Sequence, residues 1–224
     1  MNGWNERSAM VRLQLEQRGI QDTRVLDAMA QVPRHLFVPE EARDQAYGDH
    51  ALPIHEGQTI SQPYIVALMA QALALSPGER VLEIGAGSGY AAAVLSLLAG
   101  EVYTIERHPT LAESAARRLR DLGYTNVHIV SSDGTKGLPE YAPFDGIMVS
   151  AAAPWVPLPL REQLGEGGRL VIPVGGRQAQ LMLRLTRTNH QFQTERLGEV
   201  RFVPLIGAHA WQDAGDPPAH DEGE

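Results

Sequence analysis

The spacing of apolar and polar residues changes near residue 80 of this 224-residue chain. Beyond that point, short apolar runs predict buried strands at 80–84, 101–106, 127–134, 144–152 and 169–175. Stretches with helical spacing, or with a glycine at their end, predict helices between them at 89–100, 109–123 and 157–168. Strands that alternate with helices are typical of a doubly wound, mostly parallel α/β sheet.

The two ends of the chain follow other patterns. Residues 5–18 and 22–31 have the spacing of short amphipathic helices, and 63–75 predicts a third helix with Pro63 in its first turn. The proline-rich stretch 32–53 between them predicts an irregular connection with at most one short helix. Residues 178–207 read as strands without intervening helices, with a turn at Thr188-Asn189, which predicts an antiparallel addition at the sheet edge.

The length of 224 residues favours one domain with additions. Because 43% of the residues are hydrophobic, the chain can bury a full core. We expect a helical segment at 1–78 that packs on the same domain, and an α/β core with C-terminal strands at 79–210. Residues 211–224 are acidic and rich in Pro and Gly, which predicts a disordered tail.

The charge and composition of the chain argue against several classes of protein. A net charge of −8 without any basic run disfavours binding to nucleic acid. The absence of cysteine excludes disulfides, thiolate nucleophiles and cysteine-bound zinc, and the eight histidines have no metal-ligand spacing, so we expect no metal. The N-terminus does not resemble a signal peptide, and no stretch approaches the roughly 18 apolar residues of a membrane span. We therefore expect a cytoplasmic protein that does not bind membranes, and a monomer.

The stretch VLEIGAGSGY contains the candidate chemistry, because it follows a strand and opens a helix where open α/β sheets bind ligands. Its glycines allow a tight turn and a close approach of ligand to backbone. A dinucleotide fingerprint needs a glycine at position 90, where this chain has Tyr90, and a triphosphate loop needs Gly-Lys-Ser/Thr, which is absent. The loop therefore gives poor support to phosphate binding.

Acidic residues end the next two predicted strands. Glu106 is placed to accept hydrogen bonds from two ribose hydroxyls, and Asp133-Gly134 combines an acid with a tight turn near an adenine edge. A glycine turn alone is more typical of a simple connection, and an acid at a strand end is usually solvated. The three features in register favour an adenosine site without a phosphate site, as in folds that bind S-adenosylmethionine.

Ser61, in the stretch EGQTISQPYIVALMAQAL, allows two interpretations. Serine is a preferred helix N-cap and Pro63 is tolerated in the first turn, so the residue has a structural explanation. The alternative is that the Ser61 hydroxyl touches a substrate.

Several motifs resemble one family of class I S-adenosylmethionine-dependent methyltransferases. The stretches VPRHLFVPE, LPIHEGQTISQP, VLEIGAGSGY and VRFVPLIG are similar to those of protein-L-isoaspartate O-methyltransferases, and the resemblance runs from about residue 10 to 207. It implies a Rossmann-like methyltransferase fold and a repair enzyme that uses S-adenosylmethionine. Its substrates would be damaged proteins and peptides, in which it methylates the free α-carboxylate of L-isoaspartyl residues.

The resemblance also implies roles for individual residues. Ser61 matches the active-site serine of the family. Residues matched to cofactor binding are Thr59, Ile60, Glu83, Gly85, Gly87, Glu106, Arg107, Asp133 and Gly134. Residues matched to the segment that closes the substrate cleft are Val203, Pro204 and Leu205. Ile206, Val66 and the stretch HALPIHEG depart from the pattern of some relatives, but none of them belongs to the cofactor signature.

Three alternatives remain at the level of the sequence. The first is a methyltransferase for another acceptor, such as a small-molecule carboxylate or an RNA, against which the GQTIS element argues. The second is a protein that keeps the fold and binds the cofactor without chemistry, which the intact site residues disfavour. The third is a nicotinamide dehydrogenase, which Tyr90 disfavours. An isoaspartyl carboxylate is ionised near pH 7, so its methylation needs no general base.

Overall fold

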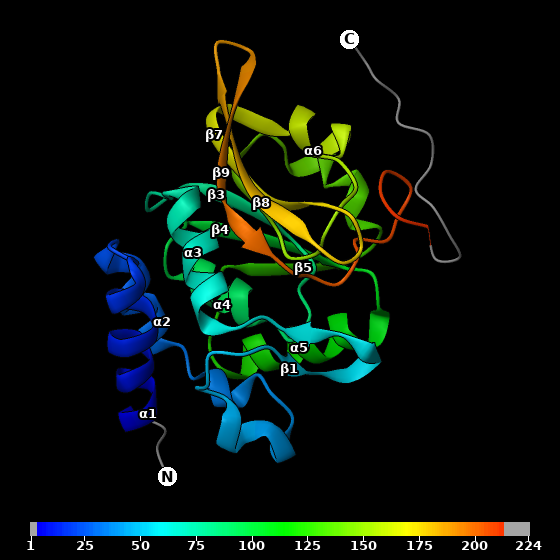
Figure 1. The fold of residues 1–224 in the computed structure, drawn as a ribbon. Coiled ribbons are helices and arrows are strands. Elements are labelled where there is room, and N and C mark those ends of the chain that lie inside the picture. The colour runs from blue at the N-terminus through cyan, green and yellow to red at the C-terminus, as the bar shows by residue number, and fades with distance from the viewer. Residues whose placement is uncertain (1–3, 213–224) are drawn as a thin grey trace.

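A seven-stranded sheet forms the centre of the computed structural model, which describes residues 4–212 (Figure 1). Its spatial order is β5-β4-β3-β6-β7-β8-β9, with parallel pairing from β5 to β7 and antiparallel pairing from β7 to β9. The strands are β3 (Arg80–Ile84), β4 (Glu101–Glu106), β5 (Val127–Ser131), β6 (Phe144–Val149), β7 (Leu164–Gly175), β8 (Gln180–Thr188) and β9 (Gln191–Val200). The predicted mostly parallel sheet with an antiparallel C-terminal addition is confirmed.

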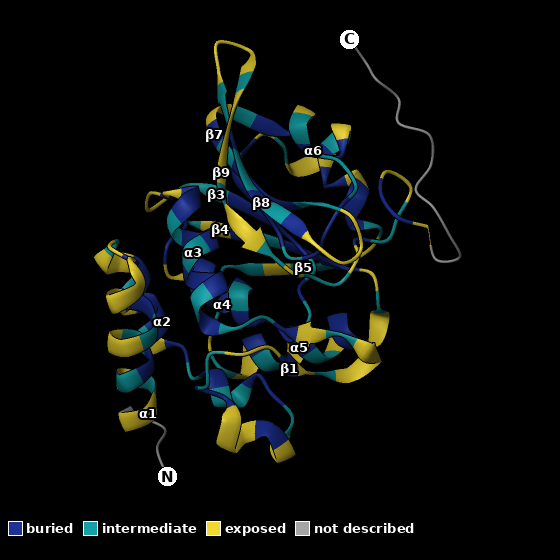
Figure 2. Ribbon diagram, in the orientation of Figure 1, coloured by how far each residue is buried: buried dark blue, intermediate teal, exposed yellow. Residues whose placement is uncertain are grey.

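Helices cover both faces of this sheet. Side chains of successive residues on a strand point to opposite faces, so Val81 and Leu82 enter two different hydrophobic clusters. The cluster with Val81 also contains residues of α2, α3 and α4, whereas the cluster with Leu82 contains Leu160 of α6. The helices are α1 (Trp4–Ala9), α2 (Thr23–Gln31), α3 (Pro63–Leu73), α4 (Tyr90–Ser96), α5 (Pro109–Asp121) and α6 (Leu158–Glu162). Figure 2 shows buried residues along α3 and α4.

The N-terminal segment shares its core with the sheet. Met10, Leu15 and Met29 are fully buried in the same cluster as Val81, so apolar packing continues across the predicted boundary at residue 78. The first predicted helix is a run of α1, a π-helical stretch (Met10–Leu15) and a 3₁₀ turn (Glu16–Arg18). No helix within residues 4–212 is both long enough and apolar enough to cross a membrane.

The predicted helix at 157–168 is wrong in its second half. The helix α6 ends at Glu162, and β7 begins at Leu164, which pairs with Phe144 before the register shifts. Glycines cause the difference, because they are poor helix formers and tolerate close backbone contacts. A Cβ at Gly168 would lie 2.8 Å from the carbonyl oxygen of Gly165.

The stretch 32–53 is more structured than predicted. It contains two 3₁₀ turns, Arg34–Leu36 and Glu40–Gln45, and it leads into a small hairpin of β1 (Leu52–Pro53) and β2 (Thr59–Ile60). Short 3₁₀ turns leave no clear periodicity in a sequence, which explains why the pattern looked irregular.

Two boundaries near the C-terminal end also move. The turn between β8 and β9 is formed by Asn189 and His190, both with positive φ, one residue later than predicted. Trp211, placed in the predicted disordered tail, is buried and donates its backbone N–H to Leu205 O. The rest of that tail, residues 213–224, lies outside the described residues.

The strand predicted at 127–134 is shorter in the structure. It ends at Ser131, and a 3₁₀ turn follows at Gly134–Lys136.

Candidate active site

The glycine loop between β3 and α4 is fastened to the end of β4. Gly85 and Ala86 donate their N–H groups to Ile105 O, at 2.8 and 3.1 Å. Gly87 donates to Glu106 Oε2 at 2.9 Å, from a left-handed conformation with φ of 52° that favours glycine. The backbone of the loop is thus held beside the carboxylate predicted to bind a ribose.

Glu106 is positioned by both of its carboxylate oxygens. Oε2 accepts from Gly87 N, and Oε1 accepts from His108 N at 3.0 Å, at the start of α5. The side chain is only 4% exposed and lies at the wall of a cavity. Each carboxylate oxygen has two lone pairs, so both oxygens keep capacity for a ligand hydroxyl. This geometry fits a ribose with two adjacent hydroxyls.

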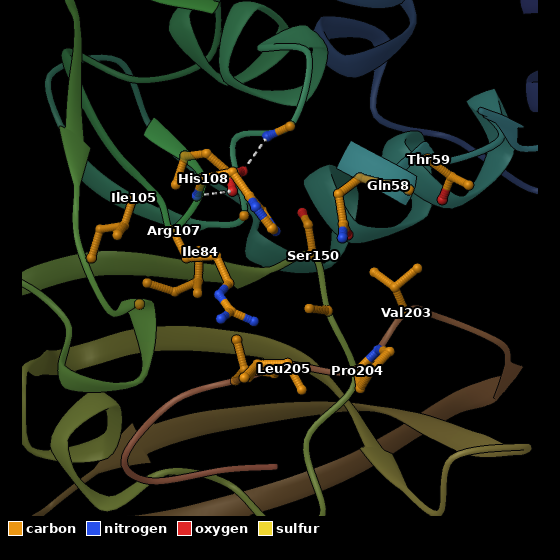
Figure 3. A pocket seen from close by; sticks show the side chains of 17 residues that line it. Gln58, Thr59, Ile84, Ile105, Arg107, His108, Ser150, Val203, Pro204 and Leu205 are labelled. Atoms are coloured by element: carbon orange, nitrogen blue, oxygen red, sulfur yellow. Dashed lines mark hydrogen bonds between the residues drawn. The ribbon is translucent and has the colours of Figure 1, made fainter. Parts of the chain in front are cut away.

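The cavity beside Glu106, here called the cofactor cavity, has a volume of about 200 Å³ (Figure 3). It is lined by Gly57, Gln58, Thr59, Ile84, Gly85, Gly87, Ile105, Glu106, Arg107, His108, Gly134, Ser150, Ala151, Val203, Pro204, Leu205 and Ile206. Ile84, Ile105 and Leu205 give it apolar walls that suit a flat base, while Glu106 supplies the polar edge.

Gly134 and Asp133 play different parts in the structure. Gly134 lines the cofactor cavity, where a side chain would overlap Ile84 Cγ2. Asp133 lies outside that cavity, in a neighbouring depression with Arg107 and Gly207. Its Oδ1 accepts from Thr135 N and Oγ1, and its Oδ2 accepts from Ala208 N at 2.9 Å. Asp133 therefore anchors the C-terminal segment beside the cavity, a role that sequence reasoning missed.

These hydrogen bonds keep Asp133 ionised. Burial alone would raise its pKa, but the bonds from Ala208 N and from Thr135 outweigh that effect, so the pKa lies below its ordinary value. The anchor is consequently present at neutral pH.

A second space, here called the inner cavity, shares Thr59, Gly85, Gly87 and Ser150 with the cofactor cavity. It is lined by Thr59, Ile60, Ser61, Val66, Met69, Glu83, Gly85, Ala86, Gly87, Ser88, Tyr90, Ala91, Met148 and Ser150. Glu83 is fully buried here: Oε2 accepts from Thr104 Oγ1 at 2.7 Å, but Oε1 has no hydrogen-bond partner among the described residues. The unpaired Oε1 leaves a polar atom available for a hydrogen bond with a ligand in this cavity.

Burial raises the pKa of Glu83 to about 8, against an ordinary value of 4.5. Between these values the folded state holds a proton that the unfolded state has lost, so the free energy of unfolding falls as pH rises. The expected slope reaches about 1.4 kcal/mol per pH unit.

Glu83→Gln is therefore expected to flatten the pH dependence of stability between pH 5 and 8. Urea unfolding of both proteins across this range measures the difference, and the mutant gains most relative to the wild type near pH 8. Parallel curves for the two proteins would show that Glu83 does not titrate in this range.

Ser61 does not cap α3. The N-cap residue is Gln62, and no side chain makes a capping hydrogen bond there, so the structural interpretation of Ser61 is wrong. Ser61 is half-buried at the junction of β2 and α3, and its hydroxyl makes no hydrogen bond within residues 4–212. The hydroxyl is thus available to a ligand.

A third space, here called the acceptor cleft, opens from Ser61 toward the surface. Its volume is about 390 Å³. It is lined by Ala51, Thr59, Ser61, Gln62, Ile65, Ser150, Ala179, Glu199, Val200, Arg201, Phe202 and Val203. Thr59 and Ser150 border all three spaces, and Ser61 borders the inner cavity and the acceptor cleft. The three spaces therefore meet at these side chains.

Ser150 is the residue that sequence reasoning missed at this junction. It directly follows β6, and its N–H donates to Ile84 O at 2.8 Å, which holds it at the carboxyl edge of the sheet. Figure 3 shows Ser150 near the middle of the site, with Gln58 and then Thr59 to its right and Val203 and Pro204 below. The sequence contained one signal for this role, because Ser150 lies at the end of a predicted buried strand, where open α/β sheets bind ligands.

The predicted site residues gather at this one edge of the sheet. Nine of them line the cofactor cavity: Thr59, Gly85, Gly87, Glu106, Arg107, Gly134, Val203, Pro204 and Leu205. Ile60, Ser61 and Glu83 line the inner cavity, while Asp133 alone lies beside these spaces. Within residues 4–212, no group of three or more His, Asp and Glu side chains is arranged to hold a metal ion.

A strand-end carboxylate beside a glycine loop without a phosphate-binding lysine suits a nucleoside that carries no phosphate chain. On this fold, that arrangement defines an S-adenosylmethionine-dependent methyltransferase of the Rossmann-like class. The family described as "Protein-L-isoaspartate(D-aspartate) O-methyltransferase (PCMT)" matches residues 5–210. The chain belongs to this family, which confirms the predicted resemblance and cofactor and excludes the dehydrogenase alternative.

Named relatives agree over nearly the whole length. A protein-L-isoaspartate O-methyltransferase of Roseiflexus castenholzii is 68% identical over 211 residues, which cover 94% of this chain and 96% of that protein. One of Methanospirillum hungatei is 52% identical over 207 residues, covering 92% and 96%.

Solved structures show the same fold. A protein-L-isoaspartate O-methyltransferase superposes with a TM-score of 0.81 at 32% identity, covering 91% of this chain and 67% of that chain. A putative enzyme of the same name from Plasmodium falciparum, in complex with S-adenosyl-L-homocysteine, gives 0.76 at 27% identity, covering 89% and 98%.

Proposed function

We propose that this chain methylates the free α-carboxylate of L-isoaspartyl residues in damaged proteins and peptides, with Ser61 as the residue that orients the carboxylate. The observation that supports this most directly is the unpaired Ser61 hydroxyl at the point where the inner cavity opens into the acceptor cleft. The methyl ester then loses methanol to form a succinimide, whose hydrolysis returns some normal aspartate.

Different residues of the site would hold different parts of the cofactor. S-adenosylmethionine supplies a methyl group activated by a sulfonium. Glu106 would accept the ribose hydroxyls, and Glu83, Gly85 and Gly87, which line the inner cavity, would hold the methionine part. Gly134 leaves room for the base beside Ile84, and Asp133 holds the C-terminal segment beside it. Thr59, Ile60 and Arg107 complete the walls.

The acceptor side needs positioning, not proton transfer. The substrate carboxylate titrates near pH 4 and arrives ionised, so no residue has to remove a proton. A Ser61 hydroxyl that donates to it contributes about 1.5–3 kcal/mol as a charge-assisted hydrogen bond. Val203 and Pro204 border the cofactor cavity, and Val203 also borders the acceptor cleft.

An isoaspartyl peptide and its normal aspartyl twin test this function. Each is incubated with the protein and methyl-labelled S-adenosylmethionine, and base-labile label on the peptide is counted. Label is expected on the isoaspartyl peptide only, and none on an isoaspartyl control whose α-carboxylate is amidated. An absence of label on every peptide, with cofactor binding intact, would reject the proposal. A monomeric state and a cytoplasmic location remain predictions.

A further inference from the structure

Arg34 is a buried cation in the VPRHLFVPE motif. This motif has no role in the methyl transfer described above. Arg34 is 0% exposed, and its Nε donates to Ala46 O at 2.7 Å. Its Nη1 and Nη2 make no hydrogen bond of normal geometry among the described residues, although the guanidinium also interacts with the Tyr90 side chain. Burying a guanidinium with two unsatisfied nitrogens is unfavourable, and an apolar side chain of similar volume is often equal or better for stability. Stability therefore does not explain this arginine.

The guanidinium contacts the aromatic ring of Tyr90. Its Cζ lies 4.8 Å from the ring centroid, which is cation–π distance, and both residues are buried. Phe37, from the same motif, packs edge-on against the ring at 5.6 Å, and the Tyr90 hydroxyl donates to Met29 Sδ at 3.6 Å. Met29, Arg34 and Phe37 thus all contact Tyr90.

Tyr90 connects this cluster to the active site. It is the first residue of α4, directly after the glycine loop, and it lines the inner cavity together with Ser61 and Glu83. Burial raises its pKa to about 12, so the phenol stays neutral at working pH and acts as a wall of the cavity. A shift of this wall would move the place where the methyl donor is held relative to Ser61.

We propose that Arg34 is a positioning residue, which fixes the Tyr90 ring through its cation–π contact and thereby sets the shape of the inner cavity. The reaction-linked part of this inference rests on the proposed function, whereas the part about cofactor binding does not. It also gives a reason for the VPRHLFVPE motif: Arg34 and Phe37 support the glycine loop from behind.

Arg34→Met removes the cation and keeps the volume. Its unfolding midpoint is expected to equal or exceed that of the wild type. The Kd for S-adenosylhomocysteine, measured by calorimetry without acceptor, is expected to rise about fivefold or more, with a similar fall in kcat. Arg34→Lys keeps a cation and should restore part of both losses. Leu15→Ala, a core substitution in the N-terminal segment, is the control: it lowers stability and leaves Kd unchanged.

Tyr90→Leu, made with Arg34 intact, supplies a second measurement. It should reproduce the loss of affinity, and adding Arg34→Met to it should cause little further change, because the two residues act as one unit. Wild-type Kd and kcat in Arg34→Met, or fully additive effects in the double variant, would overturn the proposal. Failure of the wild type to methylate isoaspartyl peptide would reject the proposed function and leave the Kd comparison decisive for Arg34.

Discussion

Glu106→Ala is expected to raise the Kd of S-adenosylmethionine at least about a hundredfold, which corresponds to about 2.7 kcal/mol. A ribose that donates both hydroxyls to Glu106 makes two charge-assisted hydrogen bonds, each worth about 1.5–3 kcal/mol. The mutation also leaves Gly87 N and His108 N without the acceptors that hold the glycine loop and the start of α5. Ligand contacts and their support are therefore lost together.

Calorimetric titration of the folded variant measures this effect. Glu106→Gln keeps one acceptor oxygen and the shape of the side chain, so an intermediate loss of about tenfold is expected. Glu101→Gln is the matched control, because Glu101 is exposed at the opposite end of β4 and contacts His128. A wild-type Kd in folded Glu106→Ala would show that the carboxylate does not hold the ribose.

The sheet was predictable because its signal is local. Apolar runs bounded by glycine and proline locate β3, β4 and β6, and the parallel connections then place their carboxyl ends at one edge. This reasoning brought Gly85, Glu106 and Gly134 together correctly. It failed at Gly168, where close backbone approach decides the conformation and no periodicity records it.

Long-range contacts limited the prediction of the site. Asp133 follows β5 as expected, but its carboxylate accepts a hydrogen bond from Ala208 N, 75 residues further along the chain. The protonation of Glu83 depends on complete burial, which only the packed fold reveals. Arg34 is similar, because a basic residue in a proline-rich stretch looks exposed until Tyr90 and Phe37 close around it.

Ser61 shows how a local rule can mislead. Serine two residues before Pro63 at a helix start fits the N-cap pattern, yet the N-cap position is occupied by Gln62, which makes no side-chain capping bond. The hairpin β1–β2 sets this turn, and neither of its two-residue strands has a distinct sequence signal. The hydroxyl is consequently left for a ligand.

Ser61→Ala should therefore separate activity from stability. Since the hydroxyl makes no capping bond, the free energy of unfolding should change by less than about 0.5 kcal/mol. The kcat for an isoaspartyl peptide should fall at least about tenfold, because a tenfold loss corresponds to about 1.4 kcal/mol of transition-state stabilisation, within the range of a charge-assisted hydrogen bond. The Kd for S-adenosylmethionine should stay near the wild-type value.

Steady-state kinetics with the isoaspartyl peptide, together with urea unfolding, measure both quantities. Ser76→Ala, an exposed substitution just beyond the other end of α3, is the control and should change neither. Ser61→Thr keeps a hydroxyl and should retain more activity than Ser61→Ala. A folded Ser61→Ala with wild-type kcat would mean that the carboxylate is oriented by other groups at the junction, of which Ser150 and Thr59 border all three spaces.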